Sequence, residues 1–103
     1  MTLLHTGVAD IRPFVADADV VVAAAGSPGI ISRDMVKPGA AVVQTGTTIV
    51  DGGYLPDVDD DVAEVAGWFS PVTGSVGPMT RAMLLTNCVQ AAEARAMRTP
   101  SRP

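Results

Sequence analysis

The feature that most constrains the fold is a pair of short strand-length runs rich in valine and alanine, each followed by a glycine. The first runs from Val20 to Ala25 and the second from Ala40 to Thr45. Neither run shows the polar alternation of a strand with one face in water, so both are typical of strands buried on both faces of a parallel sheet. Parallel strands need long connections, usually helices, between them. The sequence therefore predicts an α/β fold.

Turn residues and helix signals divide the rest of the chain. The expected elements are a strand over 2–5, a helix over 11–16 after Asp10, a helical turn over 32–35, a hairpin around Asp51-Gly52-Gly53, a helix from Asp59, a strand over 68–70 and a long helix from Gly77-Pro78. The long helix is predicted to bury a stripe of five residues in the core. These residues are Ala82, Leu85, Val89, Ala92 and Ala96. We expect one domain over residues 1–98 and a loose tail over 99–103.

Composition excludes several classes of protein. A net charge of −4 argues against a nucleic-acid surface. No apolar run reaches the roughly 18 residues of a membrane span, and no signal peptide is recognisable at the N-terminus. The single cysteine, Cys88, cannot form an internal disulfide, which favours a cytoplasmic protein. It stands among helix-forming residues, so we expect a buried, inert thiol.

The charged residues suggest no metal centre and no general base. The acidic cluster Asp57–Glu64 is interpreted as a helix start rather than a metal site, because no His or Cys lies near it. Lys37 stands in a Lys-Pro-Gly turn and is expected on the surface. His5 has no visible catalytic partner, so a strand-end or cofactor-edge role is favoured over catalysis.

Four loops are candidates for ligand binding, because they follow expected strands. In an open α/β sheet, ligands bind outside the carboxyl ends of the strands. The loops cover 5–7, 26–29, 46–48 and 71–80, and all are rich in Gly, Pro, Ser or Thr. Gly74 to Thr80 places two glycines before a helix N-terminus, whose free N–H groups suit an anion or a carbonyl. A plain tight turn explains the same residues.

Three segments carry a resemblance to a known family. They are Ala25–Ile31 (AGSPGII), Asp34–Ala40 (DMVKPGA) and Val76–Thr80 (VGPMT). From about residue 2 to residue 93, the chain resembles the bifunctional methylenetetrahydrofolate dehydrogenase/cyclohydrolase family. That family oxidises methylenetetrahydrofolate by hydride transfer to NADP, or to NAD in some members, and then hydrolyses the methenyl product. The resemblance implies a Rossmann-like parallel sheet with helices on both faces.

The resemblance also implies the roles of eight residues. Thr6 would meet the adenosine ribose or its phosphate, and Gly26 and Pro28 would lie along the cofactor. Gly46 and Thr47 would lie near the nicotinamide end. Gly74, Gly77 and Thr80 would line the place where nicotinamide and folate meet.

Several family features have no counterpart in these residues. The catalytic lysine and its tyrosine partner belong to the folate domain, and the phosphate-binding Gly-Arg-Ser segment lies upstream of the matched region. We therefore expect an incomplete domain, without its first strand and phosphate loop, and assign no catalytic residue and no metal. Within the match, Gln44-Thr45-Gly46 replaces the usual Asp-Val-Gly. Ser75 replaces a glycine and would be strained at positive φ.

The sequence thus predicts the cofactor-binding portion of an NADP-dependent methylenetetrahydrofolate dehydrogenase/cyclohydrolase, inactive alone. The alternative is a non-catalytic nucleotide-binding or oligomerisation module of the same descent. The family substrates are methylenetetrahydrofolate and methenyltetrahydrofolate, and neither nucleic acid nor a membrane is expected as a partner. Without a first strand, the strand over 20–25 would have an unpaired edge, so we expect a homo-oligomer, most simply a dimer.

Overall fold

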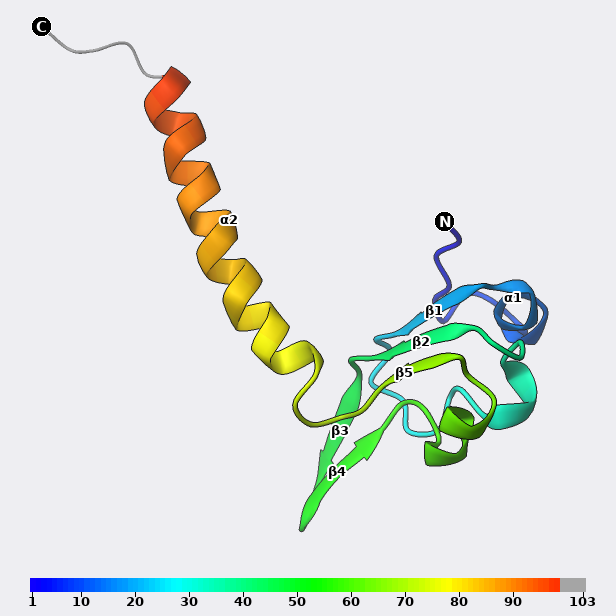
Figure 1. Ribbon diagram of the computed structural model, residues 1–103. Helices are drawn as coiled ribbons and strands as arrows, with labels where there is room; N and C mark the ends of the chain where they lie inside the picture. Colours follow the sequence, from blue (N-terminus) through cyan, green and yellow to red (C-terminus); the bar gives the residue numbers. More distant parts are fainter. Residues whose placement is uncertain (99–103) are drawn as a thin grey trace, which may run out of the picture. The chain divides into compact units, whose positions relative to one another are not determined.

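The computed structural model describes residues 1–98 (Figure 1). The chain divides into two compact units, Met1–Val72 and Thr73–Pro103. The predicted tail, 99–103, lies outside the described residues. The elements of the first unit are α1 (Arg12–Asp17), β1 (Val20–Ala23), η1 (Arg33–Met35), β2 (Ala41–Gln44), β3 (Thr47–Val50), β4 (Gly53–Pro56), η2 (Asp60–Glu64) and β5 (Trp68–Ser70).

The first unit is built on a three-stranded parallel sheet with the order β1-β2-β5 (Figure 1). The predicted Rossmann-like α/β fold is thereby confirmed. Among the described residues β1 pairs only with β2, so it is an edge strand, as expected. The strand predicted over 2–5 is wrong. His5 instead starts a turn, in which its carbonyl oxygen accepts the Val8 N–H at 2.9 Å.

The core lies on one face of this sheet. Val21 and Val42 are buried there and cluster with Val15 of α1, Met35 of η1 and Val62 of η2. Within the first unit, each of these helices therefore contributes a buried residue to the core on this face of the sheet.

The opposite face of the sheet is apolar and open. Val20, Val22 and Trp68 are 61%, 63% and 79% exposed. The expectation that β1 is buried on both faces is therefore wrong for the described residues. Successive side chains of a strand point to opposite faces, and only one face meets the helices.

Short elements bounded by Gly, Pro or Asp lie within a residue or two of their predicted positions. Asp10 Oδ1 accepts the Arg12 N–H at 3.0 Å at the start of α1, one residue later than expected. The predicted hairpin is confirmed as β3 and β4, with Val50 opposite Gly53. The predicted helix from Asp59 is the short 3₁₀ helix η2.

Two surface predictions have opposite outcomes. Lys37 lies on the surface, as expected, and forms an ion pair of 2.6 Å with Asp19 Oδ1. This ion pair and its hydrogen bond lower the pKa of the Asp19 carboxyl and raise the pKa of Lys37. Cys88 was expected in the core, but its thiol is exposed.

The described part of the second unit is dominated by the helix α2 (Val76–Arg98). It begins at Val76 rather than at Gly77, so Pro78 lies within its first turn. No residue of α2 is buried, and Leu85 and Val89 are 70% and 57% exposed. The predicted stripe is therefore exposed along its length, because a single helix offers its apolar side chains no packing partner within its own unit. Among residues 1–98, no helix has the length and apolarity needed to cross a membrane.

Candidate functional site

The carboxyl ends of the three parallel strands lie at one edge of the sheet. Ala23 is in register with Gln44, and Val43 with Ser70. The loops that follow β1, β2 and β5 therefore leave from the same edge, where ligands bind in open α/β folds. They correspond to three of the four loops predicted from the sequence, but Thr47 and Thr48 belong to β3 and Val76–Thr80 to α2 rather than to loops.

The fourth predicted loop follows no strand. It is a local turn in which His5 Nδ1 accepts the Gly7 N–H at 2.9 Å. Thr6 is exposed on this turn. His5 therefore serves the backbone of its own turn, and the strand-end role expected for it is wrong because no strand forms over residues 2–5.

The loop after β1 has two glycines in the left-handed region. Gly26 and Gly29 both have φ +67°. A Cβ at Gly26 would meet nothing within 4 Å, so glycine is required there by backbone conformation rather than by space. Thr48 Oγ1 donates to the Gly26 carbonyl oxygen at 3.1 Å, and the Gly29 N–H donates to the Pro56 carbonyl oxygen at 3.1 Å. The loop is thereby tied to both strands of the hairpin.

The loop after β2 is fastened to the end of β1 through one acceptor. The N–H groups of Thr45 and Gly46 both donate to the Ala23 carbonyl oxygen at 2.9 Å. Thr45 Oγ1 donates to the same oxygen at 2.8 Å. The structure therefore brings the Gly26 and Gly46 loops together.

Asp57, at the end of the hairpin, is a functional candidate that sequence reasoning missed. Its side chain is 0% exposed, and Oδ2 accepts the N–H groups of Ala25 at 2.7 Å and Gly26 at 2.8 Å. The Asp57 N–H donates to the Gly46 carbonyl oxygen at 3.0 Å. A Cβ at Gly46 would overlap Asp57 Oδ2. Asp57 therefore lies at the junction of the two loops.

The departure at Gln44 from the family pattern is accommodated. Gln44 is 2% exposed, and both ends of its amide are paired: Nε2 donates to the Gly46 carbonyl oxygen at 2.5 Å and Oε1 accepts the Val58 N–H at 2.9 Å. Its backbone N–H donates to Ser70 Oγ at 2.8 Å, which links β2 to β5. Gln44 thus stabilises the Gly46 loop from within.

The ligand-accessible part of this edge includes a small open pocket. Its volume is about 360 Å³, and Pro28 and Gly29 line it together with Leu55, Pro56, Asp59 and Asp60. Gly26, Pro28 and Thr47 are all exposed. The predicted residues of the first unit other than Thr6 therefore lie around two joined loops, and three of them are open to a ligand.

The remaining predicted residues, Gly74, Gly77 and Thr80, belong to the second unit. Gly74 has φ +80°, and no residue other than glycine has a positive φ among residues 1–98. Ser75 does not have the positive φ that would strain it. Thr80 Oγ1 donates to the Val76 carbonyl oxygen at 2.9 Å, inside the first turn of α2.

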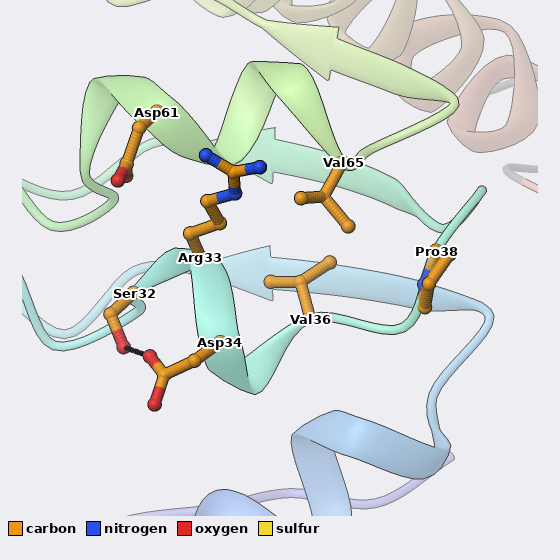
Figure 2. Close-up of a pocket in the computed structure, with 7 residues that line it drawn as sticks. All are labelled: Ser32, Arg33, Asp34, Val36, Pro38, Asp61 and Val65. Carbon is orange, nitrogen blue, oxygen red and sulfur yellow. Dashed lines mark hydrogen bonds between the residues drawn. The ribbon is translucent and has the colours of Figure 1, made fainter.

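A larger open pocket, of about 580 Å³, lies between η1 and η2 and contains none of the predicted residues (Figure 2). Three of its polar residues, Ser32, Arg33 and Asp34, have side-chain partners. Ser32 Oγ donates to Asp34 Oδ1 at 2.5 Å and lowers the pKa of that carboxyl, and Arg33 pairs with Glu64 at 2.6 Å. Within residues 1–98, no group of three or more His, Cys, Asp and Glu residues could hold a metal ion.

Comparisons with known proteins agree with this fold. The bifunctional protein FolD of Syntrophotalea carbinolica is 52% identical over 98 residues, which are 95% of this chain and 34% of the relative. FolD of Campylobacter jejuni superposes with a TM-score of 0.82 at 38% identity, over 91% of this chain and 34% of that protein. The corresponding enzyme of Thermoplasma acidophilum gives a TM-score of 0.84 at 33% identity, over 94% of this chain and 36% of that protein.

A fourth relative carries a cofactor. It is FolD of Trypanosoma brucei, complexed with NADP and an inhibitor, with a TM-score of 0.72 at 40% identity over 86% of this chain and 32% of that protein. The chain spans about a third of the length of these relatives. The family of tetrahydrofolate dehydrogenase/cyclohydrolase NAD(P)-binding domains matches residues 1–96. The resemblance noted in the sequence is confirmed, and the chain belongs to this family.

Proposed function

We propose that this chain is the cofactor-binding portion of an NADP-dependent methylenetetrahydrofolate dehydrogenase/cyclohydrolase. The observation that carries the proposal is family membership over residues 1–96, together with two glycine loops joined at the carboxyl edge of the sheet. NAD is the alternative cofactor. The family substrates are methylenetetrahydrofolate and methenyltetrahydrofolate, and a cytoplasmic location fits a chain with one free thiol.

The proposed roles of the residues are to bind and to orient. Gly26 and Pro28 would let the backbone approach the cofactor closely, and Gly46 with Thr47 would lie near its nicotinamide end. Thr6 would meet the adenosine ribose or its phosphate. The place where nicotinamide and folate meet is assigned to three residues of the second unit, Gly74, Gly77 and Thr80. The cofactor supplies the hydride acceptor, and none of these side chains is assigned a proton transfer.

Gly26 offers a sharp test, because Gly52 is a matched control. Both glycines have positive φ, +67° and +89°, and a Cβ would meet nothing within 4 Å at either one. Alanine should therefore cost both variants a similar free energy of unfolding, about 1–2 kcal/mol. Only Gly26→Ala should weaken NADP binding, since Gly52 lies at the hairpin turn.

The measurement is NADP titration by calorimetry, with urea unfolding of each variant. We expect the unaltered chain to bind with a dissociation constant on the order of 1 mM, because the Gly-Arg-Ser segment that holds phosphate in the family is unmatched here. The Gly26→Ala variant should bind several-fold more weakly than Gly52→Ala. Equal NADP affinity in the two variants would show that Gly26 does not take part in binding. No NADP binding by the unaltered chain would refute the proposed function.

One observation favours the second candidate, a non-catalytic oligomerisation module. The edge strand β1 is unpaired on one side among the described residues, and Val20 and Val22 are exposed beside that edge. Unpaired strand edges are templates for pairing with another chain. Under this reading the chain forms a homodimer, and nucleotide binding is weak or absent.

A further inference from the structure

We propose that Asp57 is a positioning residue for the cofactor: it fixes the Gly26 loop and the Gly46 loop without touching the ligand. This inference rests on the proposed function for its cofactor. Its first basis is burial, because the carboxyl group is 0% exposed and thus unavailable to a bound molecule. Any influence on binding must therefore pass through the groups that Asp57 contacts.

The first of these contacts sets the backbone of the loop after β1. Oδ2 accepts two consecutive N–H groups, from Ala25 at 2.7 Å and from Gly26 at 2.8 Å. Two successive amides that converge on one oxygen fix the orientation of both peptide planes. These two planes flank Ala25, so the hydrogen bonds fix the backbone that leads into the turn at Gly26, where φ is +67°. Such hydrogen bonds to a charged acceptor are stronger than neutral ones.

The second contact couples the same carboxylate to the loop after β2. A Cβ at Gly46 would overlap Oδ2, so the Gly46 backbone packs directly on the carboxylate. The Gly46 carbonyl oxygen accepts the Asp57 N–H at 3.0 Å and Gln44 Nε2 at 2.5 Å. Asp57 therefore contacts both of the loops proposed to flank the cofactor, in addition to the hydrogen bonds that join them at the Ala23 carbonyl oxygen.

The carboxylate is not explained by packing alone. Among residues 1–98, its second oxygen, Oδ1, is buried and has no hydrogen-bond partner. An unsatisfied buried acceptor costs stability, and an apolar side chain of similar size would fill the space without that particular cost. What an apolar side chain would not supply is the acceptor for the Ala25 and Gly26 amides. That acceptor is the contribution we assign to Asp57.

The test compares Asp57→Asn, Asp57→Val and a control, Val58→Ala, in the full chain. Asparagine keeps one oxygen for both amides, whereas valine keeps the volume and removes the acceptor. Val58 is 1% exposed in the same segment, so its truncation lowers stability without removing an acceptor from the loop. If Asp57→Val does not fold, Asp57→Asn carries the comparison.

Two readouts separate this inference from the proposed function. The first is amide hydrogen exchange and amide chemical shift at Ala25 and Gly26, measured by NMR without ligand. The second is NADP affinity per folded molecule. We expect loss of protection at both amides in Asp57→Val, affinity about tenfold weaker in that variant, a smaller loss in Asp57→Asn and no change in Val58→Ala.

Each result decides something. The inference would be overturned if the Asp57 substitutions left hydrogen exchange and chemical shift at the Ala25 and Gly26 amides unchanged. It would also be overturned if these amides changed but the NADP affinity stayed equal to that of the unaltered chain. If Val58→Ala lost as much NADP affinity as Asp57→Val at equal stability, the effect of Asp57 on binding would be explained by stability alone, and Asp57 would be a structural residue. If the unaltered chain binds no NADP, the proposed function fails, and the amide readout alone decides whether Asp57 sets the loop.

Discussion

At the scale of single residues, two glycines of the candidate site are required for different physical reasons. Gly26 adopts φ +67°, which residues with a Cβ rarely do, but it has open space around it. Gly46 has no positive φ, and the obstacle to a side chain there is the buried carboxylate of Asp57. Alanine at these positions therefore tests backbone conformation in one case and packing in the other.

We predict that Gly46→Ala costs at least about 2 kcal/mol of unfolding free energy, because overpacking against a buried group leaves no room to relax. The double variant Gly46→Ala/Asp57→Ala should recover part of that loss, since it removes the atom that the new Cβ meets. Urea unfolding of the four proteins in this cycle provides the measurement. Strictly additive losses would show that the two residues are not in contact.

At the scale of elements, local signals were sufficient where the element is defined by its own turn residues. The hairpin around Asp51-Gly52 and the short strand over 68–70 followed from sequence because turn chemistry is local. The strand over 2–5 and the buried stripe of α2 were wrong, because both depend on a partner surface. The contribution of Asp57 was equally inaccessible: it bonds to amides 31 and 32 residues away.

The edge strand β1 leads to a prediction about association. Its unpaired side, with Val20 and Val22 exposed beside it, should pair with a second copy of the chain. Val22→Lys should weaken this association, because it places a charge at the edge without entering the core. Val21 is unsuitable for the purpose, since it is only 8% exposed.

Sedimentation equilibrium over a concentration series is the appropriate measurement. Ile49→Lys is the matched control: Ile49 is 85% exposed but belongs to the hairpin. Association that is lost in Val22→Lys and kept in Ile49→Lys would assign the contact to β1. A monomer at every concentration would contradict the prediction.

At the scale of the whole molecule, the chain matches about a third of the length of enzymes that perform two reactions. We predict that these 103 residues alone show neither dehydrogenase nor cyclohydrolase turnover. Positioning and proton transfer each contribute factors of order 10² or more to a rate. None of the residues proposed to bind the cofactor is proposed as a general acid or base. Absorbance at the NADPH maximum, with methylenetetrahydrofolate and NADP supplied, is the assay. Turnover above a heat-inactivated sample would contradict it.

The carbonyl oxygen of Ala23 also limits where this chain tolerates insertions. This oxygen accepts the N–H groups of Thr45 and Gly46 and the Thr45 hydroxyl. Lengthening the chain directly after β1 or directly after β2 would therefore disturb the hydrogen bonds that join the ends of these two strands. Among residues 1–98, the hairpin that follows Gly46 has no such hydrogen bond at its tip, Asp51-Gly52, where a Cβ added at Gly52 would meet nothing within 4 Å. A peptide tag or recognition sequence is therefore best grafted at that tip, where new length would extend into solvent.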